Sequence, residues 1–117
     1  MDEEFTTESE ILLGPHKVHY SLDGEPQNPL IVCFHGFGSA GTYTYKRTAK
    51  DLVELGFKVL RFDWYGHGLS AGPNNVIYNE ELYLEQADHL LDALQLTEPF
   101  HLIGWSMGKE LWPLFYF

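Results

Sequence analysis

The stretch that decides the fold is Phe100-His101-Leu102-Ile103-Gly104-Trp105-Ser106-Met107-Gly108. Its first half is largely apolar, as expected of a buried strand, and its second half has the form Gly-x-Ser-x-Gly. A strand that runs into this pentapeptide is typical of a nucleophile elbow, a strained turn between a strand and a helix that exposes a serine hydroxyl. At Gly104 and Gly108 the neighbouring backbone is expected to leave no room for a Cβ atom. The pattern therefore predicts Ser106 as a nucleophile at the end of a strand.

Composition excludes several classes of protein. Seventeen acidic residues against seven Lys and Arg give a net charge of −10, which disfavours binding to nucleic acid or to an anionic membrane surface. The sequence has neither a signal-peptide pattern nor an apolar run near the roughly 18 residues of a membrane span. We therefore expect a cytoplasmic protein. Cys33 is the only cysteine and is interpreted as a buried apolar residue.

Three segments differ in composition. Residues 1–15 are rich in acidic side chains, so we expect a disordered terminus. Residues 16–108 are predicted to form the folded part of the chain, and residues 109–117 an apolar tail. His16 and His19 have no cluster of carboxylates or thiols beside them in the sequence, so they are interpreted as strand residues rather than metal ligands.

Strand and helix patterns alternate along the folded part. The predicted strands cover residues 17–22, 30–34, 57–64 and 100–104, and the predicted helices cover residues 44–55 and 79–96. Gly56 is expected to end the first helix and Asn79 to cap the second. This order implies right-handed crossovers and a mostly parallel sheet flanked by helices, an α/β fold.

Three sequence motifs follow successive predicted strands. They are the loop His35-Gly36-Phe37-Gly38, the motif Asp-x-x-Gly-x-Gly-x-Ser from Asp63 to Ser70, and the Ser106 pentapeptide. Open α/β sheets bind their ligands at the carboxyl ends of their strands, so we expect these motifs to lie at one edge.

Together the three motifs resemble the α/β-hydrolase superfamily, in particular its serine-nucleophile branch of serine aminopeptidase-like, monoacylglycerol lipase-like and carboxylesterase-like enzymes. The resemblance covers about residues 18–108. It implies an incomplete α/β-hydrolase fold and hydrolysis of an ester, amide or related acyl bond through an acyl-enzyme on Ser106. The implied substrate is a small molecule, a peptide or a lipid, with no metal or organic cofactor.

The resemblance also assigns roles to individual residues. The backbone amides of Met107 and Phe37 would form the oxyanion hole. Phe37 and Trp105 would line the acyl pocket, although large aromatic side chains also serve as core residues. His35 and His67 precede glycines in tight loops, and they are interpreted, like Asp63, as residues that shape these loops rather than as catalytic groups.

A nucleotide-binding module is the competing interpretation of the first loop. The stretch from Gly36 to Gly41 matches Gly-x-Gly-x-x-Gly after a strand and before a helix. Asp63 then stands about where an acid that binds a ribose is expected. This alternative leaves the Ser106 pentapeptide without a role.

The residues after Ser106 do not complete a catalytic triad. The family order is serine, acid and histidine, but only Glu110 and no histidine follow Ser106 in this sequence. Lys109, Pro113 and the apolar residues that follow also depart from the family pattern. We therefore expect a splice form, a frameshift or a truncated gene model with little or no activity. The alternatives are a non-catalytic fragment or an interaction module that associates through an open sheet edge.

Overall fold

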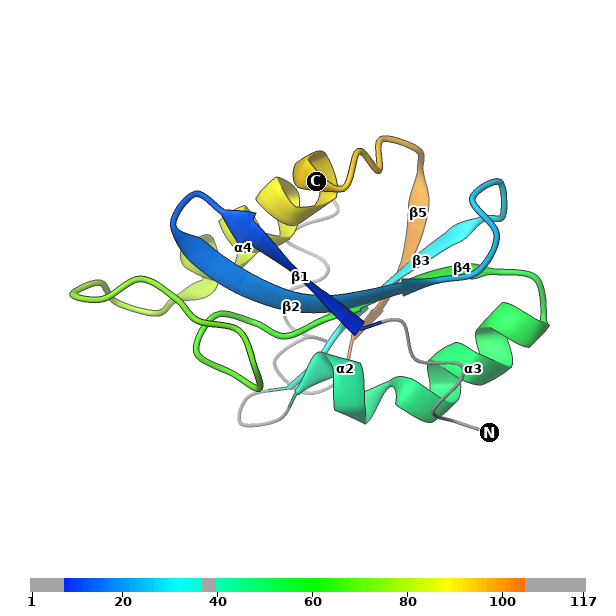
Figure 1. The fold of residues 1–117 in the computed structure, drawn as a ribbon, viewed down its shortest axis with the longest axis horizontal. Coiled ribbons are helices and arrows are strands. Elements are labelled where there is room, and N and C mark those ends of the chain that lie inside the picture. The colour runs from blue at the N-terminus through cyan, green and yellow to red at the C-terminus, as the bar shows by residue number, and fades with distance from the viewer. Residues whose placement is uncertain (1–7, 37–39, 105–117) are drawn as a thin grey trace.

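The computed structural model describes residues 8–36 and 40–104 of the 117-residue chain. These residues form one mixed sheet with helices packed on it (Figure 1). In chain order the elements are β1 (Glu8–Leu13), β2 (His16–Asp23), β3 (Leu30–Phe34), α2 (Gly41–Thr44), α3 (Lys46–Glu54), β4 (Lys58–Phe62), α4 (Glu80–Ala93) and β5 (Phe100–Gly104).

The sheet has a parallel half and an antiparallel half. Its strand order is β1-β2-β4-β3-β5, and β3 pairs in parallel with both β4 and β5. On the other side, β2 pairs antiparallel with β1 and β4. The parallel half places the carboxyl ends of β3, β4 and β5 at the same edge of the sheet.

Most of the predicted elements form where the sequence places them. The strands β2, β3, β4 and β5 and the helices α3 and α4 all lie in the predicted positions. Asn79 caps α4 as expected, because its side-chain oxygen accepts a 3.0 Å hydrogen bond from the Leu82 amide. The helix predicted at residues 44–55 is preceded by the short helix α2, and Tyr45, with a ψ of 10°, separates the two.

The N-terminal segment departs from the prediction. Residues 8–13 form β1, so the expectation of a disordered terminus is wrong for these residues, while residues 1–7 lie outside the described part. β1 pairs with β2 through a two-residue turn, from Leu13 to its partner His16. Gly14 has a φ of 60° in this turn, which glycine adopts without strain. The acidic residues of β1 belong to a largely exposed edge strand, where charge is common.

Each face of the sheet has its own apolar core. Side chains alternate along β3, so that Leu30, Val32 and Phe34 pack toward α4, while Ile31 and Cys33 pack toward α3. Burial raises the pKa of the Cys33 thiol to about 12. This supports its interpretation as an apolar residue.

A buried arginine ties α2 to the sheet. Arg61 of β4 has no exposed surface, and its guanidinium donates to Asp23 Oδ2 at 3.1 Å and to Ser21 Oγ at 2.8 Å. The same group donates to the Thr42 carbonyl oxygen in α2. The start of α2 is therefore held against β4 by a charge-assisted hydrogen bond.

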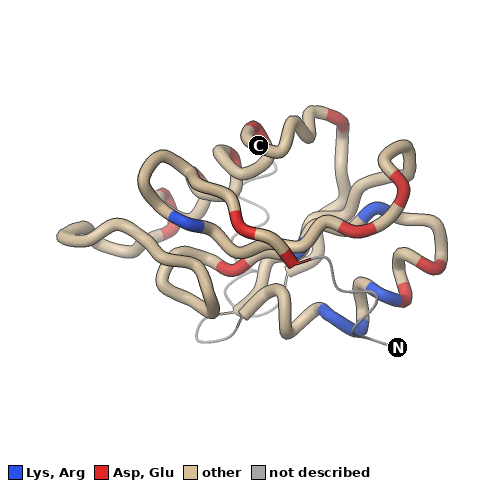
Figure 2. Tube along the Cα trace, viewed as in Figure 1, with Lys and Arg blue, Asp and Glu red and all other residues tan. Residues whose placement is uncertain are grey.

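Charge is distributed unevenly between the elements. Figure 2 shows acidic residues on strands, helices and loops, whereas three of the seven Lys and Arg residues lie on α3.

Within residues 8–36 and 40–104, no helix combines the length and the apolar character that crossing a bilayer requires.

Candidate active site

The carboxyl ends of β3, β4 and β5 bring the three predicted loops to one edge. Phe34 at the end of β3 is the register partner of Gly104 at the end of β5. On its other side, Cys33 is the partner of Arg61, which places Phe62, the last residue of β4, level with Phe34. The chain segments that lead to the three motifs therefore leave the sheet side by side, as the sequence predicted (Figure 1).

Only part of the predicted site lies within the described residues. Gly36 is buried just after β3, and Gly104 is the last residue of β5. Outside the described residues lie Phe37, Gly38, Trp105, Ser106, Met107 and Gly108. The roles assigned to these six residues stay predictions.

Asp63, directly after β4, is the polar centre of this edge. Its side chain is buried and accepts hydrogen bonds through both carboxylate oxygens. The amide and the hydroxyl of Thr42 donate to Oδ1 at 3.1 and 3.2 Å. The Leu69 amide lies 3.1 Å from Oδ2, and His19 Nδ1 lies 3.0 Å from the same oxygen. The carboxylate thus joins β2, α2 and its own loop.

The motif from Asp63 to Ser70 closes on itself. Ser70 Oγ donates to the Asp63 carbonyl at 2.7 Å and accepts from the His19 amide at 2.9 Å. Gly68 has a φ of +52°, and a Cβ atom there would overlap the Asp63 carboxylate. The spacing of the motif follows from these contacts, because the glycine makes room for the carboxylate and the serine closes the loop.

His35 and Trp64 join the first loop to the second. His35 Nε2 accepts a 2.9 Å hydrogen bond from the Trp64 amide, and the Trp64 indole donates to the His35 carbonyl at 2.9 Å. The other ring nitrogen, Nδ1, lies 2.6 Å from the Gly36 carbonyl and must carry the proton. His67 Nδ1 lies 3.1 Å from the Tyr65 carbonyl. The prediction that both histidines bind local backbone is confirmed.

The His35 ring has an unusual pKa. Burial of the ring lowers its pKa to about 4, and the hydrogen bond to the Gly36 carbonyl only partly offsets this effect. His35 is therefore neutral at pH 7, as its acceptor role toward the Trp64 amide requires.

In the structure, Asp63 is not placed as the ribose-binding acid that the nucleotide-binding alternative requires. Asp63 has no exposed surface, and its carboxylate oxygens already bind Thr42, Leu69 and His19. Gly41 does not separate the two interpretations, because a Cβ atom there would overlap the Phe62 carbonyl oxygen and close packing is also the role of the third glycine in the nucleotide-binding motif. The buried Asp63 carboxylate is not available for a ribose.

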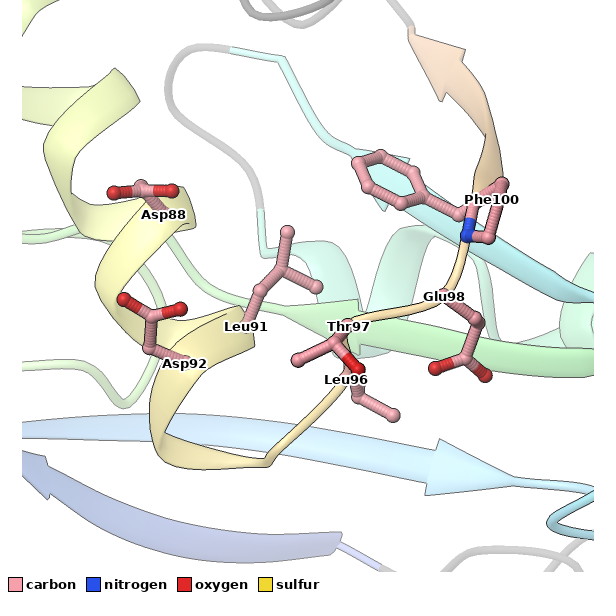
Figure 3. Close-up of a pocket in the computed structure, with 8 residues that line it drawn as sticks. Asp88, Leu91, Asp92, Leu96, Thr97, Glu98 and Phe100 are labelled. Carbon is pink, nitrogen blue, oxygen red and sulfur yellow. The ribbon is translucent and has the colours of Figure 1, made fainter.

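A separate pocket lies away from this edge. It has a volume of about 540 Å³ and lies between the end of α4 and the start of β5. Figure 3 shows Asp88 and Asp92 on α4 across from Phe100 at the start of β5. Because β5 starts at this pocket and ends at Gly104, the pocket belongs to the opposite edge of the sheet from the candidate active site.

Three residues that organise the site were not predicted from the sequence as site residues. They are His19, Thr42 and Gln86. Gln86 on α4 accepts from the Tyr65 amide at 2.8 Å and donates to the Asp63 carbonyl at 3.0 Å. A buried glutamine on the apolar face of a helix could have been a signal, whereas His19 and Thr42 are distant in sequence from their partner, Asp63.

Among the described residues, no group of three His, Cys, Asp or Glu side chains could hold a metal ion.

A sheet of this order, with glycine-rich loops after β3 and β4 and a strand that leads to Gly-x-Ser-x-Gly, defines an α/β-hydrolase fold. A family model described as serine aminopeptidase, S33, matches residues 25–110. This match covers most of the chain, so the chain belongs to the serine aminopeptidase S33 family of α/β hydrolases.

Individual relatives agree with this assignment. The chain is 33% identical over 97 residues to a proline iminopeptidase of Clostridium botulinum, covering 80% of this chain and 32% of that protein. It is 31% identical over 100 residues to a proline iminopeptidase of Lacticaseibacillus rhamnosus, covering 82% and 33%. The chain thus spans about a third of the length of these curated relatives.

Solved structures show the same fold. The thioesterase domain from the curacin biosynthetic pathway superimposes with a TM-score of 0.81 at 29% identity, covering 91% of this chain and 39% of that domain. A hydrolase from Pseudomonas aeruginosa PA01 has a TM-score of 0.77 at 29% identity, covering 90% and 38%.

The pKa of His35 predicts how stability depends on pH. His35 has a pKa of about 4 in the folded chain and of about 6.5 in the unfolded chain, so the unfolded chain binds more protons between these values. The contribution of His35 to the free energy of unfolding is therefore at its full value above pH 6.5. Lowering the pH to 4 should reduce the free energy of unfolding by about 3 kcal/mol. Urea unfolding at a series of pH values should show that the free energy of unfolding falls as the pH is lowered from 6.5 to 4. The slope of this fall should be smaller in His35→Asn.

The matched control for this measurement is His89→Asn, which changes an exposed histidine on α4. It should keep the slope of the wild-type chain. Equal slopes in His35→Asn and the wild type would contradict the neutral, buried state of His35.

Proposed function

We propose that this chain is the nucleophile-bearing part of a serine hydrolase that cleaves an ester, amide or related acyl bond. The observation that carries the proposal is the register of β5 beside β3. It sets Gly104 level with Phe34, so that Gly-x-Ser-x-Gly continues from the edge at which the His35-Gly36 loop also begins. The proposed hydrolase part starts at residue 8 rather than 16, because β1 belongs to the same sheet.

In the proposed reaction Ser106 Oγ attacks the acyl carbonyl carbon. A base takes the serine proton as the new C–O bond forms, and the carbonyl oxygen becomes negative. The amides of Met107 and Phe37 would donate to this oxygen, each contributing about 3 kcal/mol of transition-state stabilisation. Collapse of the intermediate expels the leaving group and leaves an acyl-enzyme, which water then hydrolyses. Phe37 and Trp105 are proposed to contact the acyl group.

The relatives support an acyl substrate without naming one. They include proline iminopeptidases, which belong to a peptidase class, and a thioesterase domain. The names of these proteins refer to cleavage of peptide bonds and of thioesters. We therefore propose a peptide, ester or thioester substrate, and the loops that select among them are specific to each protein.

The serine needs a base that the 117 residues do not supply in the family order. His101 is the last histidine in the sequence, and Glu110 is the only acid after Ser106. A serine hydroxyl is a weak nucleophile until an oriented base removes its proton. We therefore propose that a protein consisting of these residues alone has little or no hydrolase activity.

Chemical rescue tests both parts of this proposal. A fluorophosphonate probe should label the 117-residue chain slowly, and added imidazole should raise the labelling rate by at least about tenfold by acting as the missing general base. Ser106→Ala should remove the increase, whereas Ser9→Ala, at an exposed position in β1, should retain it. Intact-mass spectrometry measures the labelled fraction.

Two results would count against the proposal. Imidazole-dependent labelling that persists in Ser106→Ala would show that Ser106 is not the nucleophile. Rapid, stoichiometric labelling without imidazole, lost in Ser106→Ala, would show that another group already activates the serine.

A second candidate is a non-catalytic role in association through β5. Within the described residues β5 is an edge strand of the sheet, and its residues are more exposed than those of β3 or β4. An apolar edge strand offers backbone groups to a strand of another molecule. We propose that copies of the 117-residue chain self-associate through this edge.

A charge placed on the edge should reduce this association. His101 lies in β5 and is exposed, so His101→Lys adds a positive charge without replacing a core side chain. Sedimentation velocity should show less self-association for His101→Lys than for the wild type. The control His89→Lys makes the same change on α4 and should behave as the wild type. A monodisperse wild-type monomer would rule out association through β5.

A further inference from the structure

We propose that His19 is a positioning residue of the candidate active site. It holds Oδ2 of the Asp63 carboxylate, so that Oδ1 is fixed toward Thr42. At Thr42 the chain leaves the glycine-rich loop that starts at His35. The inference rests on the proposed hydrolase function, since that loop matters to catalysis only if it supplies an oxyanion-hole amide.

The His19 ring is enclosed between two carboxylates. Its side chain is 6% exposed, and Nδ1 lies 3.0 Å from Asp63 Oδ2 while Nε2 lies 2.9 Å from Glu8 Oε1. Thr42 Oγ1 lies 3.2 Å from Nδ1, but its own hydrogen is directed to Asp63 Oδ1. Nδ1 therefore faces only acceptors and must carry a proton. His19 donates to Asp63 rather than accepting from it.

Asp63 transmits this constraint to Thr42. The two carboxylate oxygens divide their partners, since Oδ2 binds His19 and Leu69 while Oδ1 binds the amide and hydroxyl of Thr42. A rotation of the carboxylate would break the contacts on both sides. Because two donors hold Oδ2, the orientation of Oδ1 toward Thr42 is fixed.

Thr42 is held on all of its polar groups. Asp63 binds its amide and its hydroxyl, and the Arg61 guanidinium donates to its carbonyl oxygen. The residue before it, Gly41, lies so close to the end of β4 that a Cβ atom would overlap the Phe62 carbonyl. The exit of the loop is therefore fixed to β4. Its entrance is fixed to Trp64 by the hydrogen bond of His35.

Glu8 anchors the far side of the ring. It comes from β1, while His19 lies on β2 and Asp63 follows β4, so one imidazole links β1, β2 and the loop after β4. This gives the acidic first strand a role in the site, as the partner that keeps the His19 ring turned toward Asp63.

Two substitutions separate the two faces of the ring. In His19→Asn the side-chain amide nitrogen falls near the position of Nδ1 and can still donate to Asp63. In His19→Gln it falls near the position of Nε2, so the donor to Asp63 is lost while the amide nitrogen faces Glu8. Both variants replace the ring by a polar amide, which makes each the control for the other.

Hydrogen exchange of the whole 117-residue chain, followed by mass spectrometry with single-residue fragmentation, tests the proposal. In His19→Gln the Thr42 and Leu69 amides should exchange at least about tenfold faster than in the wild type, because their acceptor is no longer oriented. The amide of Leu60, in the central strand β4, should change far less. His19→Asn should restore slow exchange at Thr42 and Leu69.

The proposal is wrong if Thr42 and Leu69 lose no more protection than Leu60 in His19→Gln, or if His19→Asn loses as much as His19→Gln. If His19→Gln does not fold, 15N NMR of selectively labelled histidine in the wild-type chain decides. A protonated Nδ1 at His19 supports the proposal and a bare Nδ1 overturns it. Labelling of Ser106 is independent of these readouts, so a failure of the hydrolase function would be seen separately.

Discussion

The buried carboxylate of Asp63 is the interaction on which the active-site edge depends. A carboxylate removed from water is costly unless hydrogen bonds replace its hydration, and here the donors come from Thr42, Leu69 and His19. These donors belong to α2, to the loop after β4 and to β2. Satisfying one carboxylate therefore draws together three segments that are far apart in the sequence, and each is held in one arrangement.

The glycines of the motifs follow from the same constraint. Gly68 leaves the space that the Asp63 carboxylate fills, and Gly41 leaves space for the Phe62 carbonyl at the end of β4. His35 then ties the start of the first loop to Trp64, the residue next to Asp63. The consecutive residues Asp63 and Trp64 thus hold the exit and the entrance of the glycine-rich loop, and the segment from β5 to Ser106 begins beside that entrance.

Much of this could be predicted from the sequence because the signals are local. The apolar run at Leu30–Phe34 and the Asn79 cap are patterns within short windows, and they predicted β3 and the start of α4. β1 was not predicted, because edge strands tolerate charge. The turn at Gly14 was nevertheless a usable signal for a strand before it. The link from His19 to Asp63 spans 44 residues, and no local pattern shows which buried donors will meet a carboxylate.

The most direct test of this account is the unfolding free energy of Asp63→Asn, measured by urea titration against Asp51→Asn. Asp51 is an exposed residue on α3. An amide at position 63 must turn its NH2 group toward donors, because both carboxylate oxygens accept hydrogen bonds. We predict a loss of about 3 kcal/mol or more for Asp63→Asn and a change within about 0.5 kcal/mol for Asp51→Asn. Equal, small effects of the two substitutions would contradict the central role of the Asp63 carboxylate.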